Sequence, residues 1–243
     1  TSVLDPERMI FYGGTSAGDY KDKTVTFFAY DLVNRKVLHT ATNGPARCMI
    51  LAKSTGRVYY MDEANDRLMR YDPASGTPLE VIPGTIGLRA ATDETLDGFV
   101  YTVSKTDGKL FRFHTETEEI TEIGDSVVAT QVYTASLDAD PTGRYLYYIP
   151  GAHGGSQKDG TPVVQFDIKK RSRKVIAFLQ PVLEKKFGYV TLGTYSTAVA
   201  PDGSTLFVTW NGNRSGWDNR GRYPFDTCAL TVIHIPESER RLD

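Results

Sequence analysis

The sequence predicts an all-β fold, a β-propeller with five four-stranded blades in this chain. Runs typical of short strands recur in groups of four, at a spacing of about 40 to 53 residues. Tight turns, such as those at 140–144 and 201–204, separate the first and second runs of a group. The 14 tyrosines and 11 phenylalanines also favour strands. Together these observations indicate antiparallel sheets arranged as consecutive blades.

Each unit is expected to contribute its strands in chain order. The first strands are expected at 47–52, 89–94, 133–138 and 195–200. The second strands are expected at 9–14, 57–62, 99–104, 144–150 and 205–210. The third strands are expected at 24–31, 67–72, 109–114, 162–167 and 229–234. The fourth strands are expected at 36–41, 79–82, 119–123 and 174–179.

We expect one domain, with units near 1–43, 44–85, 86–125, 126–190 and 191–243. The first unit starts inside its first strand, and the last unit stops after its third. The tail 237–243 is too charged to be a convincing fourth strand. The chain is therefore either a five-bladed ring with a three-stranded last blade or the C-terminal part of a larger propeller. Because it begins at Thr1, with neither an initiator methionine nor a signal peptide, we expect a processed, cut or incomplete chain.

The turn Pro201-Asp202-Gly203 stands directly before an expected strand. Together with the four-strand repeat, this motif resembles the propellers of the YVTN, gluconolactonase-like and WD-repeat superfamily, and the resemblance covers the whole chain. It implies the fold and says almost nothing of function. Gluconolactonase-like members hold a metal with acids and asparagines at the channel mouth, whereas arginine and tyrosine stand there in this sequence. That departure argues against a metal-dependent lactonase, and we expect no metal and no cofactor.

The composition argues against several classes of partner. The formal charge of −2 argues against a nucleic-acid or anionic-membrane partner, which would need a basic surface. The basic run 169–174 lies between two expected strands and is interpreted as a solvated turn. No apolar run approaches the roughly 20 residues that span a bilayer. The compartment stays open, with export to the periplasm or the extracellular space favoured.

Cys48 and Cys228 are the two cysteines, and they lie far apart in the sequence. They match neither a zinc site nor a dense disulfide framework. One disulfide is the alternative, but we expect two unpaired, small, buried side chains. Their Cα atoms should lie farther apart than the roughly 7 Å that a disulfide allows.

Loop lengths differ between the two faces of the predicted propeller. The connections between first and second strands and between third and fourth strands share one face, the turn face. All of them are short, which predicts a scaffold. The opposite face, the long-loop face, receives the loops 13–23, 150–160 and 211–227 and the crossover 180–194. Long glycine-rich loops on one face of a rigid scaffold are typical of binding sites, so we expect the site there.

Four side chains are expected at the mouth of the central channel on the long-loop face. Counted back from the turn glycines, the first strands place there Arg47, Arg89, Tyr133 and Tyr195. Two guanidinium groups and two phenols suit an anionic or hydroxyl-rich ligand, because arginine matches the geometry of a carboxylate or phosphate. The alternative is that the two arginines pair with neighbouring acidic side chains in the channel.

His153 is the histidine expected in a loop of that face, which makes it a candidate general base or metal ligand. The alternative is a loop histidine bonded to a backbone carbonyl. His39, His114 and His234 stand at strand positions and are interpreted as structural. Trp217 is a candidate for stacking on a sugar ring, and packing over the base of its own loop is the alternative.

These residues favour a protein that binds a small or extended polar ligand, an anion or a carbohydrate. If the protein is an enzyme, the residues fit β-elimination on a uronate sugar. Arg47 and Arg89 would then hold the carboxylate, and Tyr133, Tyr195 or His153 would move the proton. Propeller polysaccharide lyases resemble this chain in fold and residue type, and their arginine and histidine or tyrosine serve these roles.

The alternative function is a non-catalytic interaction propeller. The long-loop face would then dock a protein or the missing N-terminal part of a larger propeller. An exposed apolar patch would support this function, and its candidate members are Phe187, Tyr189, Trp217, Tyr223 and Phe225.

Overall fold

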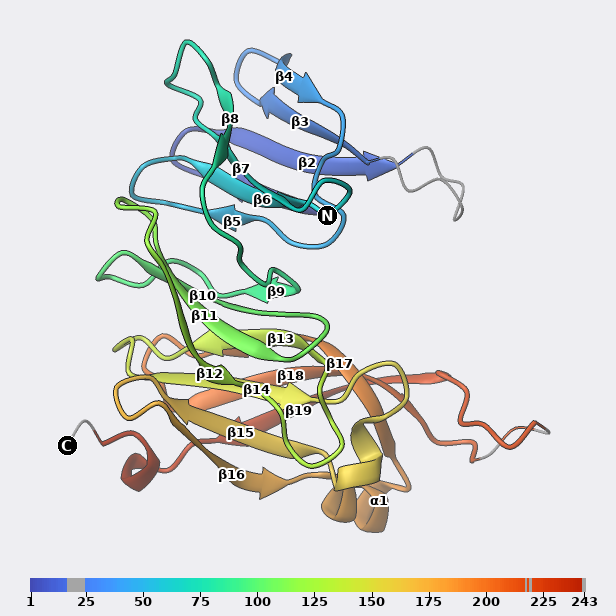
Figure 1. Ribbon diagram of the computed structural model, residues 1–243. Coiled ribbons are helices and arrows are strands. Elements are labelled where there is room, and N and C mark those ends of the chain that lie inside the picture. Colours follow the sequence, from blue (N-terminus) through green and yellow to red (C-terminus); the bar gives the residue numbers. More distant parts are fainter. Residues whose placement is uncertain (17–24, 217, 219, 242–243) are drawn as a thin grey trace.

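The computed structural model describes residues 1–16, 25–216, 218 and 220–241, and of Tyr195 it describes the backbone. Within that part, nineteen strands form five antiparallel sheets, and the α-helix α1 spans Gln180–Phe187. The predicted all-β propeller architecture is confirmed. Each sheet is one blade, and its strands follow one another in chain order (Figure 1).

The blades have the following strands. The first blade comprises β1 (Ser2–Asp5), β2 (Ile10–Ser16), β3 (Val25–Asp31) and β4 (Lys36–Ala41). The second comprises β5 (Ile50–Leu51), β6 (Val58–Asp62), β7 (Arg67–Tyr71) and β8 (Leu79–Ile82). The third comprises β9 (Ala90–Ala91), β10 (Phe99–Val103), β11 (Lys109–His114) and β12 (Ile120–Asp125), and the fourth β13 (Thr134–Ala139), β14 (Tyr145–Pro150), β15 (Pro162–Asp167) and β16 (Ser172–Phe178). The last comprises β17 (Val190–Val199), β18 (Thr205–Asn213) and β19 (Thr227–His234).

The turn between the first and second strands of a blade depends on glycine. Gly56, Gly98, Gly143 and Gly203 have φ angles of 78°, 79°, 69° and 72°. Residues with a Cβ rarely adopt this left-handed conformation, which glycine adopts without steric cost. The second to fifth blades therefore share one turn geometry at these positions.

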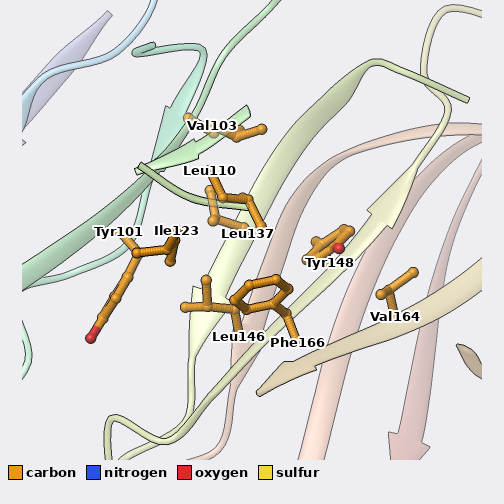
Figure 2. Close-up of a cluster of buried hydrophobic side chains, with 10 residues drawn as sticks. Tyr101, Val103, Leu110, Ile123, Leu137, Leu146, Tyr148, Val164 and Phe166 are labelled. Carbon is orange, nitrogen blue, oxygen red and sulfur yellow. The ribbon is translucent and has the colours of Figure 1, made fainter. Parts of the chain in front are cut away.

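Apolar clusters between successive blades hold the blades together. Figure 2 shows the cluster between the third and fourth blades, which includes Leu110 and Tyr101 on one side and Leu146 and Phe166 on the other. Leu146 is fully buried, and burying a side chain of this size contributes about 2 kcal/mol to stability. Corresponding clusters join the first blade to the second, the second to the third and the fourth to the last.

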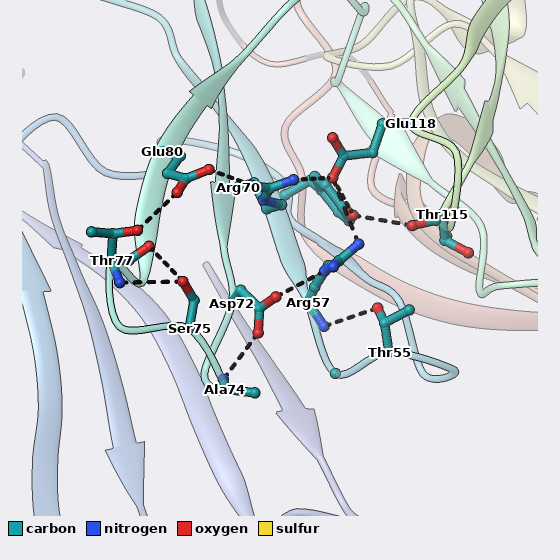
Figure 3. Close-up of polar contacts among 12 residues, drawn as sticks. Thr55, Arg57, Arg70, Asp72, Ala74, Ser75, Thr77, Glu80, Thr115 and Glu118 are labelled. Atoms are coloured by element: carbon teal, nitrogen blue, oxygen red, sulfur yellow. Dashed lines mark hydrogen bonds and ion pairs between the residues drawn. The ribbon is translucent and has the colours of Figure 1, made fainter.

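An ionic network also ties the second blade to the third (Figure 3). The Glu118 carboxylate, in the turn after β11, accepts hydrogen bonds from Arg70 Nη1 at 2.8 Å and from the Tyr59 hydroxyl at 3.0 Å. Arg57 Nη1 lies 4.0 Å from the same carboxylate, and Arg57 Nε donates to Asp72 at 3.0 Å. Two arginines and a tyrosine of one blade are thus held by an acid of the next.

The last blade has three strands. A 3₁₀-helix at Glu237–Glu239 follows β19, and up to residue 241 the tail adds no fourth strand to this sheet. Among the described residues, no apolar cluster joins the last blade to the first. In Figure 1 the first blade lies at the top of the view and the last in its lower half. The five blades therefore form an open arc.

Two of the expected loops contain helical structure. Loop 150–160 includes a 3₁₀-helix at Ser156–Asp159, and the crossover 180–194 folds into α1 and the start of β17. A proline in the first turn of α1 and Gly188, with a φ of 59° just after its end, set the limits of this helix. In the part of the chain that the structure describes, no helix is both long and apolar enough to cross a membrane.

Two side chains, Cys228 and Tyr189, differ in burial from what the sequence predicted. Cys48 and Cys228 are unpaired, as predicted, but Cys228 is exposed, so the expectation of two buried thiols is wrong for this residue. Burial raises the pKa of the Cys48 thiol to about 11. Tyr189 was a candidate for the exposed apolar patch, yet it is buried and its hydroxyl donates to the Thr227 carbonyl at 2.9 Å. Tyr189 therefore belongs to the core of the last blade.

Candidate functional site

Loop 150–160 forms one wall of the long-loop face, and it is held against β17. The Gly154 amide donates to the Leu192 carbonyl at 3.0 Å. A Cβ atom at Gly193 would lie 2.9 Å from Ala152 Cα, closer than real contacts allow. The loop therefore approaches the strand at a distance that only glycine permits.

Buried polar groups fix the base of this loop. Thr161 and Thr191 are fully buried, and their hydroxyl groups are hydrogen-bonded to each other. The side-chain carbonyl of Gln180 accepts from the Thr191 amide at 2.9 Å and from the Thr191 hydroxyl at 2.7 Å. Because Gln180 begins α1, the loop, the helix and β17 are joined by one satisfied buried network.

Arg89 and Tyr133 stand at the entrances of β9 and β13, and they are in contact. Arg89 Nε donates a hydrogen bond to the Tyr133 hydroxyl, and Arg89 Nη1 donates to the Ala135 carbonyl at 3.4 Å. The guanidinium carbon also lies 5.0 Å from the centre of the Tyr133 ring. The sequence spacing predicted these two residues at one level of the channel mouth, and in the structure their side chains are in contact.

His153 joins this pair from loop 150–160. Its ring centre lies 4.9 Å from that of Tyr133, with the two ring planes tilted by 45°. Its φ of 57° is uncommon for a residue with a Cβ atom. Burial lowers the pKa of the His153 imidazole, and the positive charges of Arg89, Arg47 and Lys105 lower this pKa further. The lowered pKa favours the neutral form of the imidazole at neutral pH.

Arg47, one of the cations that lower this pKa, has an acidic neighbour. Its Nε lies 3.8 Å from the Glu63 carboxylate, and the two side chains are 34% and 52% exposed. An ion pair this long and this exposed contributes about 0 to 1 kcal/mol. The expected alternative, a salt bridge at the channel, is thus observed for Arg47 in a weak form, whereas no carboxylate partner of Arg89 is found among the described residues.

Arg47, Arg89 and Lys105, the cations around His153, form a cationic cluster. A cavity of about 580 Å³ opens beside it, at His153. Its lining includes His153, Gln157, Lys158, Leu192, Arg222 and Phe225. The Gln157 side-chain carbonyl is buried and has no hydrogen-bond partner in the described part of the chain. Phe225 is 57% exposed and offers an apolar surface at the rim. Cavities of this volume are typical of sites for small ligands.

Two of the predicted site residues cannot be placed in full. Trp217 lies outside the described residues, and the side chain of Tyr195 does as well. The backbone of Tyr195 lies within β17, at a point where the pairing with β18 shifts its register. Ser136 of β13 is hydrogen-bonded to Thr197 of β17, so residues that are 61 positions apart in the sequence lie side by side on these neighbouring strands. The roles predicted for Trp217 and Tyr195 stay predictions.

His39 and His114 have surroundings that fit the predicted structural roles. His39 packs between the rings of Phe27 and Tyr71, at centre distances of 6.4 and 5.5 Å. His114 Nδ1 accepts hydrogen bonds from the amides of Glu116 and Thr117, at 3.3 and 3.2 Å. That is the role which an aspartate plays in the corresponding turns, for example Asp31 with its Val33 and Asn34 amides. Within the described residues, no three His, Cys, Asp or Glu side chains gather as a metal site.

The sequence did not single out Lys105. It follows β10 in a short loop between a second and a third strand, and such loops lie on the long-loop face, so assigning this short loop to a face would have identified Lys105.

The turn face was expected to be a scaffold without a site. It holds a cavity of about 520 Å³ lined partly by Asp138, Leu96 and Val199. Burial raises the pKa of the Asp138 carboxyl to about 6, although its carboxylate accepts the Val199 amide at 2.6 Å. No signal in the spacing of the turns pointed to this cavity.

No family model and no curated protein sequence matches this chain. Its structure is similar to that of Kuenenia stuttgartiensis hydrazine synthase, with a TM-score of 0.66 and 15% identity over 98% of this chain and 63% of that one. It is also similar to the WD40 repeats of RRP9, with a TM-score of 0.57 and 11% identity over 86% of this chain and 56% of that one. For U3-55K the TM-score is 0.56 and the identity 10%, over 86% of this chain and 57% of that one.

The chain is a repeat β-propeller. At these identities the similarity concerns the fold alone. The propeller spans less than two thirds of the length of each matched chain. What it binds must therefore be argued from its own side chains.

Proposed function

We propose that this propeller binds a ligand with a carboxylate or a comparable anionic group on its long-loop face. The observation that carries the proposal is the set of hydrogen-bond partners of Arg89. Two of its five N–H groups are used by Tyr133 and Ala135, and no carboxylate pairs with it among the described residues. A guanidinium held in this way by neutral groups presents a fixed fork to an incoming anion.

The surroundings of Arg89 support the same ligand class. Arg89, Arg47 and Lys105 are cations close enough to His153 to lower the pKa of its imidazole. Carboxylates lie nearby as well: Glu63, which is half-exposed and 3.8 Å from Arg47, and Asp218, which lines the adjoining cavity and is paired with Arg222. Arg89, Arg47 and Lys105 would attract an anion that enters this cluster.

The adjoining cavity favours a ligand that also carries hydroxyl groups. The buried carbonyl of Gln157 would accept a hydrogen bond from a ligand donor, and such a bond would remove an unsatisfied buried acceptor. Phe225 would cover one apolar face of the ligand. A uronate-containing sugar combines a carboxylate, hydroxyl groups and an apolar ring face, so it fits the cluster and the cavity together.

The direct test is calorimetric titration of the protein with oligogalacturonates and with their methyl esters. The esters keep the sugar and remove the charge, so we expect binding of the acids that weakens with salt and much weaker binding of the esters. Arg89→Gln should weaken binding of the acids by about tenfold or more. Arg171→Gln, in an exposed turn of the opposite face, is the matched control and should leave binding unchanged. Equal affinity for acids and esters, or none for either, would refute the proposal.

A catalytic version of this function is a β-elimination, and the lowered pKa of His153 favours it. A neutral imidazole can take the proton from the carbon beside the carboxylate while Arg89 holds that carboxylate. The electron pair then forms a carbon–carbon double bond, and the glycosidic oxygen leaves with its electrons. Ultraviolet absorbance of the unsaturated sugar detects this product. His153→Gln should abolish it while ligand binding persists, and absence of the product with the unmodified protein rules out catalysis on this substrate.

The second candidate is docking of a protein, and the exposure of Phe187 and Phe225 favours it. Each is 57% exposed on or beside the long-loop face. Exposed phenylalanines of this kind often lie in interfaces. If the titrations find no anionic ligand, docking becomes the leading function, and Phe225→Ser should then weaken capture of the partner without changing the fold.

A further inference from the structure

The outward face of the last blade, turned away from the fourth blade, exposes apolar side chains. Burial alternates along β19 and along most of β18. Phe207, Leu230 and Val232 are 36%, 59% and 60% exposed, and Phe207 is the cross-strand partner of Val232. The other face of these strands supplies Val208 and Trp210 to the cluster with the fourth blade. The last blade is therefore apolar on both faces.

A sheet that is apolar on both faces is typical of one that is buried on both faces. The fourth blade is such a case within this chain. Every residue of β14 and β15 is buried, because this blade lies between the third and the last. The last blade has the same two-sided pattern, yet among the described residues it packs against one blade alone.

The first blade has a comparable outward face. Leu4, Phe11, Tyr30 and Val37 form a cross-strand row that runs through all four strands. Leu4 and Val37 are 45% and 57% exposed. The opposite face of the blade supplies Tyr12 to the cluster with the second blade. Both ends of the arc thus present an apolar blade face to solvent.

We propose that these two outward faces are blade–blade interfaces, covered by further four-stranded blades of the same polypeptide that close the ring. Continuity with the interfaces inside the arc supports this occupant, because each outward face repeats the apolar pattern that successive blades bury between them. Blades inserted between the two ends would cover both faces at once. A second copy of this chain, by contrast, would place five more blades at the gap between the first and the last blade.

Each matched chain extends beyond the region that is similar to this propeller. The region similar to this propeller covers 63%, 56% and 57% of those chains, so more than one third of each lies outside it. The outer edge of β19 also has no strand partner on that side in the described residues. Unpaired edges of this kind are usually covered in native proteins.

Cys228 offers a test without any substitution, because it lies on the outward face of β19 and is exposed. We would compare its rate of reaction with a thiol reagent in this 243-residue chain and in the complete natural polypeptide. Cys48, whose thiol is buried between blades, is the internal control and should react slowly in both. Covering by a further blade should slow the reaction of Cys228 by about tenfold or more in the complete polypeptide.

Each outcome decides the proposal. Fast reaction in the 243-residue chain at every concentration, with protection in the complete polypeptide, supports further blades. Fast reaction in both proteins overturns the proposal. Protection that appears in the 243-residue chain as its concentration rises identifies a second copy as the occupant, and that also overturns it.

A substitution gives an independent measurement. Val232→Lys places a charge on the outward face, and Val33→Lys, at a 68% exposed turn position, is the matched control. We expect Val232→Lys to leave the melting temperature of the 243-residue chain unchanged and to lower that of the complete polypeptide by at least about 2 °C. An unchanged melting temperature in both proteins would contradict the proposed interface.

Discussion

Replacement of Glu118 by alanine should loosen the second blade from the third. The substitution removes two hydrogen bonds to a charged group, from Arg70 Nη1 at 2.8 Å and from the Tyr59 hydroxyl at 3.0 Å (Figure 3). Such bonds contribute about 1.5 to 3 kcal/mol each when their loss leaves a buried group unpaired. Here Arg70 keeps Glu80 and the Tyr59 hydroxyl keeps the Thr115 carbonyl, so we expect a total cost of about 2 kcal/mol.

The backbone at Glu118 sharpens this prediction. Its φ of 61° lies in the left-handed region, where a Cβ atom costs about 1 kcal/mol. Alanine keeps that strain and glycine relieves it, so Glu118→Gly should cost about 1 kcal/mol less than Glu118→Ala.

Urea denaturation measures both variants. At an m value of about 3 kcal/mol/M, Glu118→Ala should lower the midpoint by about 0.7 M. Glu116→Gln, an exposed acid of the same turn, is the control and should leave the midpoint unchanged. If Glu118→Ala also leaves it unchanged, the network in Figure 3 does not stabilise the contact between these blades.

Three further predictions concern the two faces. The pKa of Asp138 in the folded protein is about 6, against an ordinary value of 3.8, so the fold favours the protonated acid. The free energy of unfolding should therefore fall as the pH rises from about 4 to about 6. Asp138→Asn should remove this pH dependence and raise stability above pH 7 by about 3 kcal/mol, as measured by denaturation at several pH values. In an NMR titration the His153 imidazole should show a pKa below its ordinary value of 6.5. Arg89→Gln should raise that pKa, because it removes a nearby cation. An unchanged pKa would show that the charge of Arg89 does not act on His153. Gly193→Ala should cost about 1 to 3 kcal/mol and weaken ligand binding, because its Cβ would push Ala152 and the loop away from β17; unchanged stability would show that the loop yields freely.

The blade repeat could be predicted from the sequence because its signals are local. A turn glycine such as Gly143 or Gly203 is required by backbone sterics at its own position, whatever the rest of the fold does. Strand alternation likewise depends on neighbours in the chain. The spacings from Arg89 and Tyr133 to their turn glycines, nine and ten residues, predicted both residues near one level, and their side chains are in contact in the structure.

Burial could not be predicted in the same way, because it depends on what covers each blade face. Cys228 stands in a strand whose apolar residues alternate as they would in an interior blade, and it is exposed because nothing in the described chain lies over it. Tyr189 was expected in a loop and is buried because β17 begins at Val190, beside it. The register shifts of β17 around Tyr195 are equally non-local, since the pairing with β18 determines them.

The arginines of this chain show why residue type alone did not locate the ligand site. Arg144 binds Asp167 through Nε at 2.9 Å and Nη2 at 2.7 Å, with both side chains largely buried. A ligand cannot compete for that guanidinium, because breaking a buried bidentate pair costs about 3 to 5 kcal/mol. Arg47 is held by an exposed pair worth about 0 to 1 kcal/mol, and Arg89 is held by a phenol and a carbonyl. The strength of the interaction that each guanidinium group already makes decides whether it stabilises a blade or can bind an anion. The sequence does not show this strength.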